Sequence, residues 1–256
     1  MHFVDYEKLK KEMIGESVPN STGEKSGHTV ATPFENLVYS KIKEQIPLKT
    51  FRQYEYLNNL YSQSPDITKV KERQALIKSL SVRFLLNRGV KPTKEWSIKK
   101  LFEEKQNDTA DMIVVKDDFF EIIDIKTKRE FAGGGRPPNI ISAYKLAQVC
   151  TKMIDNNEFD TFTINYFEID WTEQVNKLVC IDARVVNLFK ANPESLYINW
   201  TAGKQIQVSL FSIEQNFIGT QKDWAIKYLK HFTTKFKENE INQRAKFLTP
   251  FEKYIK

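Results

Sequence analysis

The sequence feature that most constrains the fold is a pair of apolar, β-branched runs separated by three charged residues. The runs cover residues 110–115 and 119–126, and Lys116, Asp117 and Asp118 lie between them. Valine and isoleucine favour extended chain, whereas aspartates between apolar runs are typical of a turn. This spacing predicts a β-hairpin near the middle of the chain. Its apolar strands indicate burial, so any polar residue on them is informative.

Three charged side chains interrupt this apolar hairpin. Asp111 lies at the start of the first strand, and Asp124 and Lys126 lie on the second. Because side chains alternate across a strand, Asp124 and Lys126 share one face, while Ile123 and Ile125 share the other and face the core. Folding back over the turn brings Asp111 beside Asp124. We therefore predict that two carboxylates and one amine converge at one edge of a sheet.

Such a set suits hydrolysis of a phosphodiester bond. Asp111 and Asp124 supply the hard oxygen ligands that Mg²⁺ prefers, and the main-chain carbonyl of Ile125 could add another. The metal lowers the pKa of a bound water and neutralises charge, and Lys126 could orient the attacking water. The alternative is a solvated strand edge, the usual setting of an Asp-x-Lys sequence. Glu35 is a candidate carboxylate behind these ligands, although a solvated first-turn glutamate is the preferred interpretation.

The remaining patterns predict a single α/β domain over residues 1–256. Residues 15–32 have the composition of a loop, and Thr32 and Pro33 are typical of the start of a helix that ends near Gln45. Further helical patterns lie at 51–62, 72–88, 97–105 and 138–157. Strand patterns lie at 161–170, 177–182 and 196–211, the last interrupted by Ala202 and Gly203, and the C-terminal part is helical from about residue 224.

Composition limits the class of protein. A net charge of +6 fits a nucleic-acid partner, because Lys and Arg displace counterions from phosphates, although a merely basic protein is an equal alternative. The two cysteines, Cys150 and Cys180, form neither a disulfide framework nor a zinc ribbon. No apolar run approaches the roughly 20 residues that cross a bilayer, and the polar N-terminus is no secretory signal. We therefore expect a cytoplasmic protein with no membrane association.

Beyond the hairpin, the sequence resembles type II restriction endonucleases of the HincII/HindII type, within the PD-(D/E)xK nuclease superfamily. The resemblance rests on motifs spread over nearly the whole chain: SGH at 26–28, PFE at 33–35, QYEYLN at 53–58, WSI at 96–98, LFEEKQNDTA at 101–110, PNIISAYKLAQ at 138–148, YINW at 197–200 and YLKHF at 228–232. It implies a restriction-endonuclease-like α/β fold, in which helices flank a central mixed β-sheet. It also implies that Asp111, Asp124 and Lys126 are catalytic and that the two aspartates bind Mg²⁺.

The resemblance further implies a homodimer that cuts double-stranded DNA at a short palindrome and leaves blunt ends. Cleavage of both strands at a palindrome requires two active sites related by a two-fold axis. The palindrome would be GTYRAC-like, or a relaxed version of it. A cognate DNA methyltransferase would act on the same site without forming a stable complex with the nuclease.

Three residues are candidates for DNA contacts through the same resemblance. Asn139 and Asn199 match family positions that touch bases, and an asparagine amide can pair with adenine. Without the resemblance, a helix N-cap for Asn139 and a turn for Asn199 would be preferred. Arg136 stands where the family has a glutamine that enters the DNA stack, in a slightly longer loop. A guanidinium can stack on bases or hold phosphates, so the preference at the central bases stays open.

Two other functions are compatible with parts of this pattern. A Mg²⁺-dependent repair or structure-specific nuclease would keep the three charged residues and cut without palindrome specificity. A DNA-binding protein without catalysis would use the basic C-terminal helix, which carries Lys227, Lys230, Lys235 and Lys237. Buried carboxylates that face phosphate contribute nothing to binding alone, so Asp111 and Asp124 argue against the second of these functions.

Overall fold

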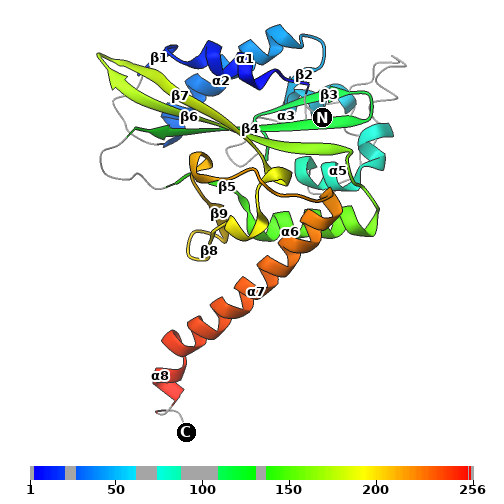
Figure 1. The fold of residues 1–256 in the computed structure, drawn as a ribbon, viewed down its shortest axis with the longest axis vertical. Coiled ribbons are helices and arrows are strands. Elements are labelled where there is room, and N and C mark those ends of the chain that lie inside the picture. Colours follow the sequence, from blue (N-terminus) through cyan, green and yellow to red (C-terminus); the bar gives the residue numbers. More distant parts are fainter. Residues whose placement is uncertain are drawn as a thin grey trace.

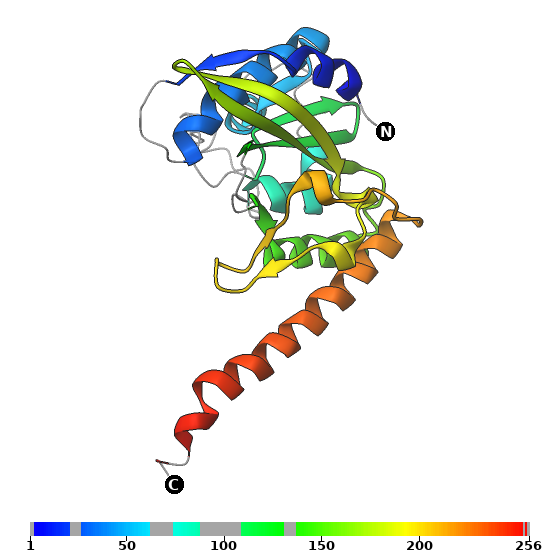
Figure 2. The same cartoon turned by 60° about the vertical axis from the view of Figure 1, so that its left-hand side comes forward.

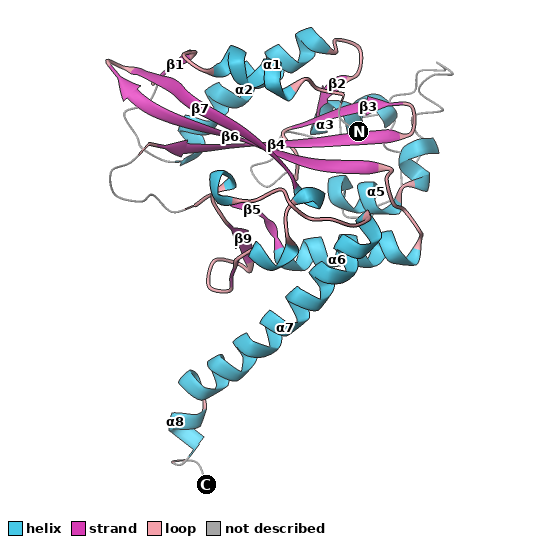
Figure 3. Cartoon of the chain, viewed as in Figure 1, coloured by secondary structure: helices cyan, strands magenta, loops and turns pink. Residues whose placement is uncertain are grey.

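A curved six-stranded β-sheet lies at the centre of the computed structural model (Figures 1 and 3). The structure describes residues 3–20, 27–61, 74–87, 109–130, 137–252 and 254. The strand order is β1-β7-β6-β4-β3-β2, and every neighbouring pair is antiparallel except β4 and β6. The strands are β1 (Ser17–Pro19), β2 (Thr50–Arg52), β3 (Met112–Lys116), β4 (Phe119–Arg129), β6 (Phe162–Gln174) and β7 (Lys177–Asn187). This mixed sheet confirms the expected α/β fold.

The predicted hairpin is formed by β3 and β4. Met112 pairs with Ile123 and Lys116 pairs with Phe119, so the turn falls at the expected charged residues. Asp117 takes a positive φ of 54° in this turn, a conformation that aspartate tolerates better than most residues. The far edge of β4 pairs in parallel with β6, which places β4 in the interior of the sheet.

Helices cover both faces of this sheet (Figure 1). Helices α1 (Tyr6–Met13) and α2 (Gly27–Gln45) cover one face, where apolar residues of α2 join a core cluster with Ile123 and Ile125. The other face packs against α3 (Gln53–Tyr61), α5 (Leu80–Asn87) and α6 (Ala143–Asp155). No helix within the described ranges is long and apolar enough to span a membrane.

A small second sheet and a long helix complete the fold. The sheet has the order β5-β9-β8, with β5 at Asn139–Ser142, β8 at Ile198–Asn199 and β9 at Gln205–Gln207. Helix α7 (Gln221–Phe247) starts against the body and then projects away from it toward the short helix α8 (Thr249–Glu252), as Figures 1 and 2 show. Short 3₁₀ turns occupy Leu188–Lys190, Pro193–Ser195 and Leu210–Ser212.

The prediction of a loop at 15–32 was wrong at two places. Residues 17–19 form β1, a strand too short to have its own sequence pattern, which exists because it pairs with β7. Helix α2 begins at Gly27 rather than at Thr32, and Pro33 lies inside it. Proline removes one main-chain hydrogen bond there, and the packing of Phe34, Val38 and Ile42 in the core offsets that loss.

Other element boundaries also differ from the expectation. The helix predicted at 51–62 begins at Gln53, because Thr50–Arg52 form β2, and β6 continues to Gln174, beyond the predicted end at 170. The helix predicted from residue 138 begins at Ala143, because residues 139–142 pair with β9 as β5. The strand predicted at 196–211 is the hairpin β8–β9 followed by a 3₁₀ turn. Strand β7 continues to Asn187, beyond the predicted end at 182. Helix α7 begins at Gln221, where Thr220 and Asp223 form a capping box, and continues unbroken for 27 residues.

Two expectations fall on parts of the chain that the structure does not describe. The helix at 97–105 and the loop that carries Arg136 lie outside the described residues. The single domain over residues 1–256 stays a prediction.

Candidate active site

The three charged residues of the hairpin lie together where Asp111, just before β3, meets the middle of β4. Lys126 Nζ lies 2.7 Å from Asp124 Oδ2, and both residues project from the same face of β4. Asp111 precedes β3, and its Oδ2 accepts a hydrogen bond of 2.5 Å from the main-chain N–H of Ile125. A second main-chain bond, from the Asp111 N–H to the Ile123 carbonyl, ties the start of β3 to β4. The structure therefore brings together the residues that strand alternation and the turn place on one face.

Burial controls the electrostatics of this group. Asp124 is only 4% exposed, and burial raises the pKa of its carboxyl well above the ordinary value. Lys126 opposes that rise and the Asp111 carboxylate adds to it. Burial by itself lowers the pKa of Lys126, but the carboxylates of Asp124, Asp111 and, more weakly, Glu35 raise it overall. Two carboxylates share one ammonium group, so the site favours additional positive charge.

Glu35 lies on α2, which packs on the sheet beside β4, and its charge acts on Lys126. Because α2 begins at Gly27, Glu35 stands two turns inside the helix and is half-buried. The interpretation as a solvated first-turn glutamate was therefore wrong, since it depended on a helix start at Thr32.

A further carboxylate that sequence reasoning missed is Glu168 on β6. It pairs with Lys126 in the parallel register of β4 and β6 and is fully buried. One of its oxygens accepts a hydrogen bond of 2.8 Å from the Leu210 N–H, while Oε1 is buried without a hydrogen-bond partner among the described residues. Burial, with a contribution from Asp170, raises the pKa of Glu168 to about 7. An acidic residue within the apolar run at 161–170 was the signal that could have identified it.

The donor set at Asp111 and Asp124 fits a divalent cation that keeps most of its water. No group of three or more His, Cys, Asp or Glu side chains in the described part of the chain is arranged to hold a metal ion. Mg²⁺ is commonly held by one or two carboxylates together with water and phosphate oxygens. The buried Asp124 and the partly buried Asp111, with one lysine, meet that requirement.

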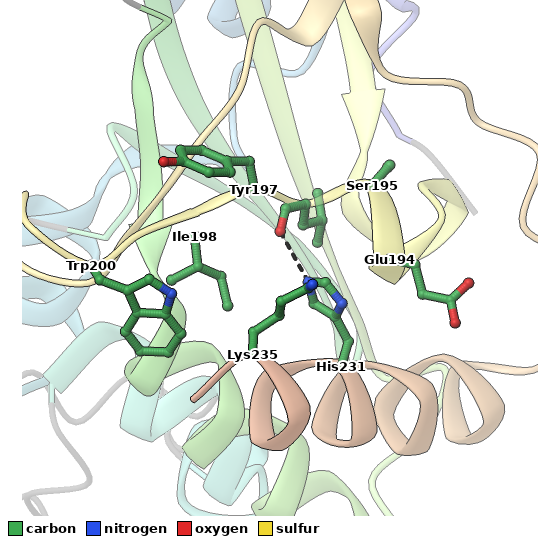
Figure 4. Close-up of a pocket in the computed structure, with 8 residues that line it drawn as sticks. Glu194, Ser195, Tyr197, Ile198, Trp200, His231 and Lys235 are labelled. Atoms are coloured by element: carbon green, nitrogen blue, oxygen red, sulfur yellow. Dashed lines mark hydrogen bonds between the residues drawn. The ribbon is translucent and has the colours of Figure 1, made fainter. Parts of the chain in front are cut away.

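The small sheet has one apolar face and one amide face. Ile141, Ile198 and Ile206 pair across the three strands and are buried. Figure 4 shows Ile198 and Trp200 on the side of β8 that faces α7, and Trp200 packs against Phe236 with ring centroids 5.6 Å apart. Because neighbouring side chains alternate, the opposite face carries the amide side chains of Asn199, Gln205 and Gln207. Asn139 pairs with Gln207 across a β-bulge between Asn139 and Ile141, which interrupts the alternation along β5.

Asn199 and Asn139 take different positions in this small sheet. Asn199 Oδ1 accepts hydrogen bonds from the N–H groups of Thr201 and Ala202, both at 3.1 Å, so Asn199 does form a turn. Asn139 is exposed on β5, and Ser142 provides the N-cap of α6 by accepting from the Lys145 N–H. The N-cap alternative for Asn139 was wrong because the strand continues three residues further than the helical pattern indicated.

The basic residues of α7 are partly neutralised. Lys227 forms an ion pair with Glu194 at 3.0 Å, and Lys235 pairs with Glu238 at 2.8 Å. Lys235 also borders a pocket of about 280 Å³ between β8 and α7, in which His231 Nε2 lies 3.2 Å from the Leu196 carbonyl (Figure 4). This surface is typical of a solvated helix rather than of a dedicated anion site.

A mixed sheet between two helical layers, with two carboxylates and a lysine on one hairpin, defines a restriction-endonuclease-like α/β protein. The model of the family described as "Restriction endonuclease HincII" matches residues 9–255. The type II restriction enzyme HindII of Haemophilus influenzae (strain ATCC 51907 / DSM 11121 / KW20 / Rd) is 49% identical over 98% of this chain and 97% of its own length. The type II restriction enzyme HincII of Haemophilus influenzae is 48% identical over the same shares.

The chain belongs to the HincII restriction endonuclease family. It is accordingly a type II restriction endonuclease, a hydrolase that cleaves DNA. The resemblance stated from the sequence motifs is thereby confirmed over nearly the full length of the chain.

Proposed function

We propose that the chain is a Mg²⁺-dependent, site-specific deoxyribonuclease in which Asp111, Asp124 and Lys126 carry the hydrolysis of the phosphodiester bond. The observation that supports this most directly is the buried Asp124 carboxylate, with Lys126 Nζ at 2.7 Å and the Asp111 carboxylate held beside it. A buried carboxylate with a raised pKa, such as that of Asp124, is costly for the fold, and a divalent cation would offset that cost.

Each residue has a distinct role in this proposal. Asp111, Asp124 and the carbonyl of Ile125 would hold the Mg²⁺ ion, which when bound lowers the pKa of water and neutralises charge on the phosphate. The Ile125 N–H orients the Asp111 carboxylate through their hydrogen bond. Lys126 stays protonated because the carboxylates raise its pKa, so it donates hydrogen bonds to the attacking water or to a phosphate oxygen. Glu35 supports that charged state from α2.

The expected partner is double-stranded DNA, cut as a homodimer at a short GTYRAC-like or relaxed palindrome with blunt ends. Arg136, Asn139 and Asn199 are the proposed DNA contacts. Asn139 is exposed, so its amide can both donate to and accept from an adenine edge. A methyltransferase that acts on the same site would protect the host DNA. Because the enzyme would meet both its DNA substrate and the protected host DNA in the cytoplasm, we place it there.

Replacing Asp124 tests the proposed site. Asp124→Asn removes the buried charge without changing the size of the side chain. We expect plasmid cleavage in Mg²⁺ to fall about 1,000-fold or more, because several kcal/mol of charge stabilisation are lost. Binding of the same DNA, measured without cleavage in Ca²⁺, should persist.

Asp117→Asn is the matched control, since Asp117 lies in the exposed turn of the same hairpin and asparagine tolerates its positive φ. Undiminished cleavage by Asp124→Asn would remove the mechanism. Sequencing the ends that the wild-type enzyme leaves on genomic DNA tests the specificity. One fixed blunt palindrome supports restriction, whereas scattered ends would indicate a repair or structure-specific nuclease.

A further inference from the structure

We propose that Gln207 reads a base in the major groove and that, together with Asn199, it selects guanine by directing the NH₂ groups of the two amides toward the base. This inference rests on the proposed function, because it assigns part of the sequence specificity of the same DNA-cleaving enzyme. Gln207 lies on β9, the middle strand of the small sheet. Its position pairs with Asn139 of β5, and its side chain bonds to Asn199 of β8, so it lies between the two proposed base contacts.

The side chain of Gln207 projects from the amide face of the small sheet. Its neighbour Ile206 is fully buried between Ile141 and Ile198, and side chains alternate along a strand. Gln207 is therefore directed away from the core and is half-exposed, next to the exposed Asn139. A row of amides on one sheet face suits the edges of bases, because amides both donate and accept.

The hydrogen bonds of Asn199 fix which way its amide points. Its Oδ1 accepts from the main-chain N–H groups of Thr201 and Ala202 and from Thr201 Oγ1 at 2.8 Å. Only an oxygen can accept from these N–H groups, so the other end must be the NH₂ group. That Nδ2 donates to Gln207 Oε1 at 2.8 Å. The oxygen of Gln207 is therefore directed at Asn199, and the orientation of its amide is fixed in turn.

The polarity of the pair follows from this chain of bonds. Asn199 has one remaining N–H on Nδ2, and Gln207 has the two N–H groups of Nε2. Asn199 Oδ1 already accepts three hydrogen bonds and Gln207 Oε1 accepts one from Asn199, so the free end of each amide is its NH₂ group. Guanine presents two neighbouring acceptors in the major groove, N7 and O6, whereas adenine places a donor beside its acceptor. The pair therefore complements guanine, and Asn199 in this arrangement does not suit the bidentate adenine contact that an unconstrained asparagine makes.

Cleavage of base-modified duplexes tests the inference with the full-length enzyme in Mg²⁺. The recognition site is first mapped from the ends that the wild-type enzyme leaves. Each guanine of the site is then replaced in turn by 7-deazaguanine, which lacks the N7 acceptor. At one guanine of each half-site, we expect kcat/KM of the wild type to fall about 10- to 100-fold, the usual loss for a bidentate base contact.

Variants of Gln207 show whether this loss belongs to that residue. On unmodified DNA, kcat/KM of Gln207→Ala should be lower than that of the wild type by a similar factor. Modifying that one guanine as well should change kcat/KM of Gln207→Ala by less than about twofold, because the contact is already gone. Gln207→Glu keeps an oxygen for Asn199 but replaces the outward donor by an acceptor, so it should lose at least as much as Gln207→Ala. Asn157→Asp, the same amide-to-carboxylate change at the exposed far end of α6, is the control and should leave cleavage unchanged.

The outcomes separate this inference from the proposed function. A recognition palindrome without guanine would overturn the role of Gln207 and leave the nuclease assignment intact. The same holds if the loss of kcat/KM from Gln207→Ala multiplies with the loss from 7-deazaguanine at every guanine of the site. Multiplying losses would mean that Gln207 only supports the fold of the turn. If Gln207→Ala fails to fold, Gln207→Met retains the side-chain length and is measured in the same cycle. Scattered ends or no cleavage by the wild type would instead remove the proposed function itself.

Discussion

At the scale of single residues, buried charge explains most of what is specific to this protein. Asp124 and Lys126 stand on a strand whose alternate residues, Ile123 and Ile125, are core residues. The strand holds the charged pair rigidly because its apolar side cannot move without opening the core. Glu168 on the neighbouring strand shows the same principle, since it is buried and its hydrogen bond comes from a main-chain N–H. Each of these groups is therefore sensitive to substitution and to pH.

Glu168 predicts a pH-dependent stability. Its pKa of about 7 in the folded state lies above the ordinary value, so its neutral form favours the fold. The corresponding stability is fully present at pH values below the unfolded-state pKa and is lost as the pH rises through 7. Glu168→Gln stays neutral at every pH. We expect its free energy of unfolding to match that of the wild type near pH 5 and to exceed it by about 1–3 kcal/mol near pH 8.5.

Urea denaturation at several pH values between 5 and 8.5 measures this difference. Glu44→Gln, at an exposed position of α2, is the control and should show no such divergence. A stability difference between Glu168→Gln and the wild type that stays constant across this range would contradict the assignment of a buried, titrating carboxyl to position 168.

At the scale of elements, α7 is anchored at one end only. Its first two turns bury Trp224 and Tyr228, whose rings stack with centroids 5.4 Å apart. Trp224 Nε1 donates to the Ala191 carbonyl at 2.8 Å, and the Tyr228 hydroxyl donates to the Ala143 carbonyl at 2.9 Å. Beyond residue 240 every described residue of α7 is exposed. The Ala143 bond joins α7 to the first residue of α6, directly after β5, and so fixes the small sheet against the body.

Removing the anchor of α7 should destabilise the whole protein. Trp224→Ala deletes a fully buried ring, and substitutions of this kind cost about 3–5 kcal/mol of the free energy of unfolding. Ile218→Ala, at an isoleucine that is 96% exposed just before the helix, should change that free energy by no more than about 0.5 kcal/mol. Chemical denaturation of both variants provides the comparison. Equal effects would mean that α7 contributes nothing to the folded core.

At the scale of the whole molecule, two features bear on how the enzyme meets DNA. The chain has a net charge of +6, which favours a polyanionic partner. One chain presents one set of Asp111, Asp124 and Lys126, and a palindrome presents two equivalent strands. Symmetric cutting therefore needs two chains related by a two-fold axis.

Sedimentation equilibrium at micromolar concentration tests this expectation. We expect a particle of about twice the 30.0 kDa of a single chain without DNA, and two chains bound to each duplex when DNA is present. A single chain under both conditions would contradict the proposed homodimer and would require each strand to be cut in a separate binding event.

The sequence by itself determined the hairpin and its charged face. A period of two residues is local information, so the order of residues alone assigns Asp124 and Lys126 to one side of β4 and Asp111 to the same end of the hairpin. The motifs along the chain identified the family for the same reason. Local patterns did not predict the strands that depend on pairing with a distant segment. The short strands β1 and β5 exist because they form hydrogen bonds with β7 and β9.

Only the tertiary structure decided the electrostatic state of Asp124, the position of Glu168 beside Lys126 and the fixed orientation of the Asn199 and Gln207 amides. A pKa depends on burial and on charges from other strands, and the orientation of an amide depends on its hydrogen-bond partners. Those partners come from segments far apart in the chain, such as β4 with β6, so no local pattern contains them. The residues proposed for the chemistry are local in the sequence, whereas the amide orientations on which the proposed selectivity rests arise from long-range contacts.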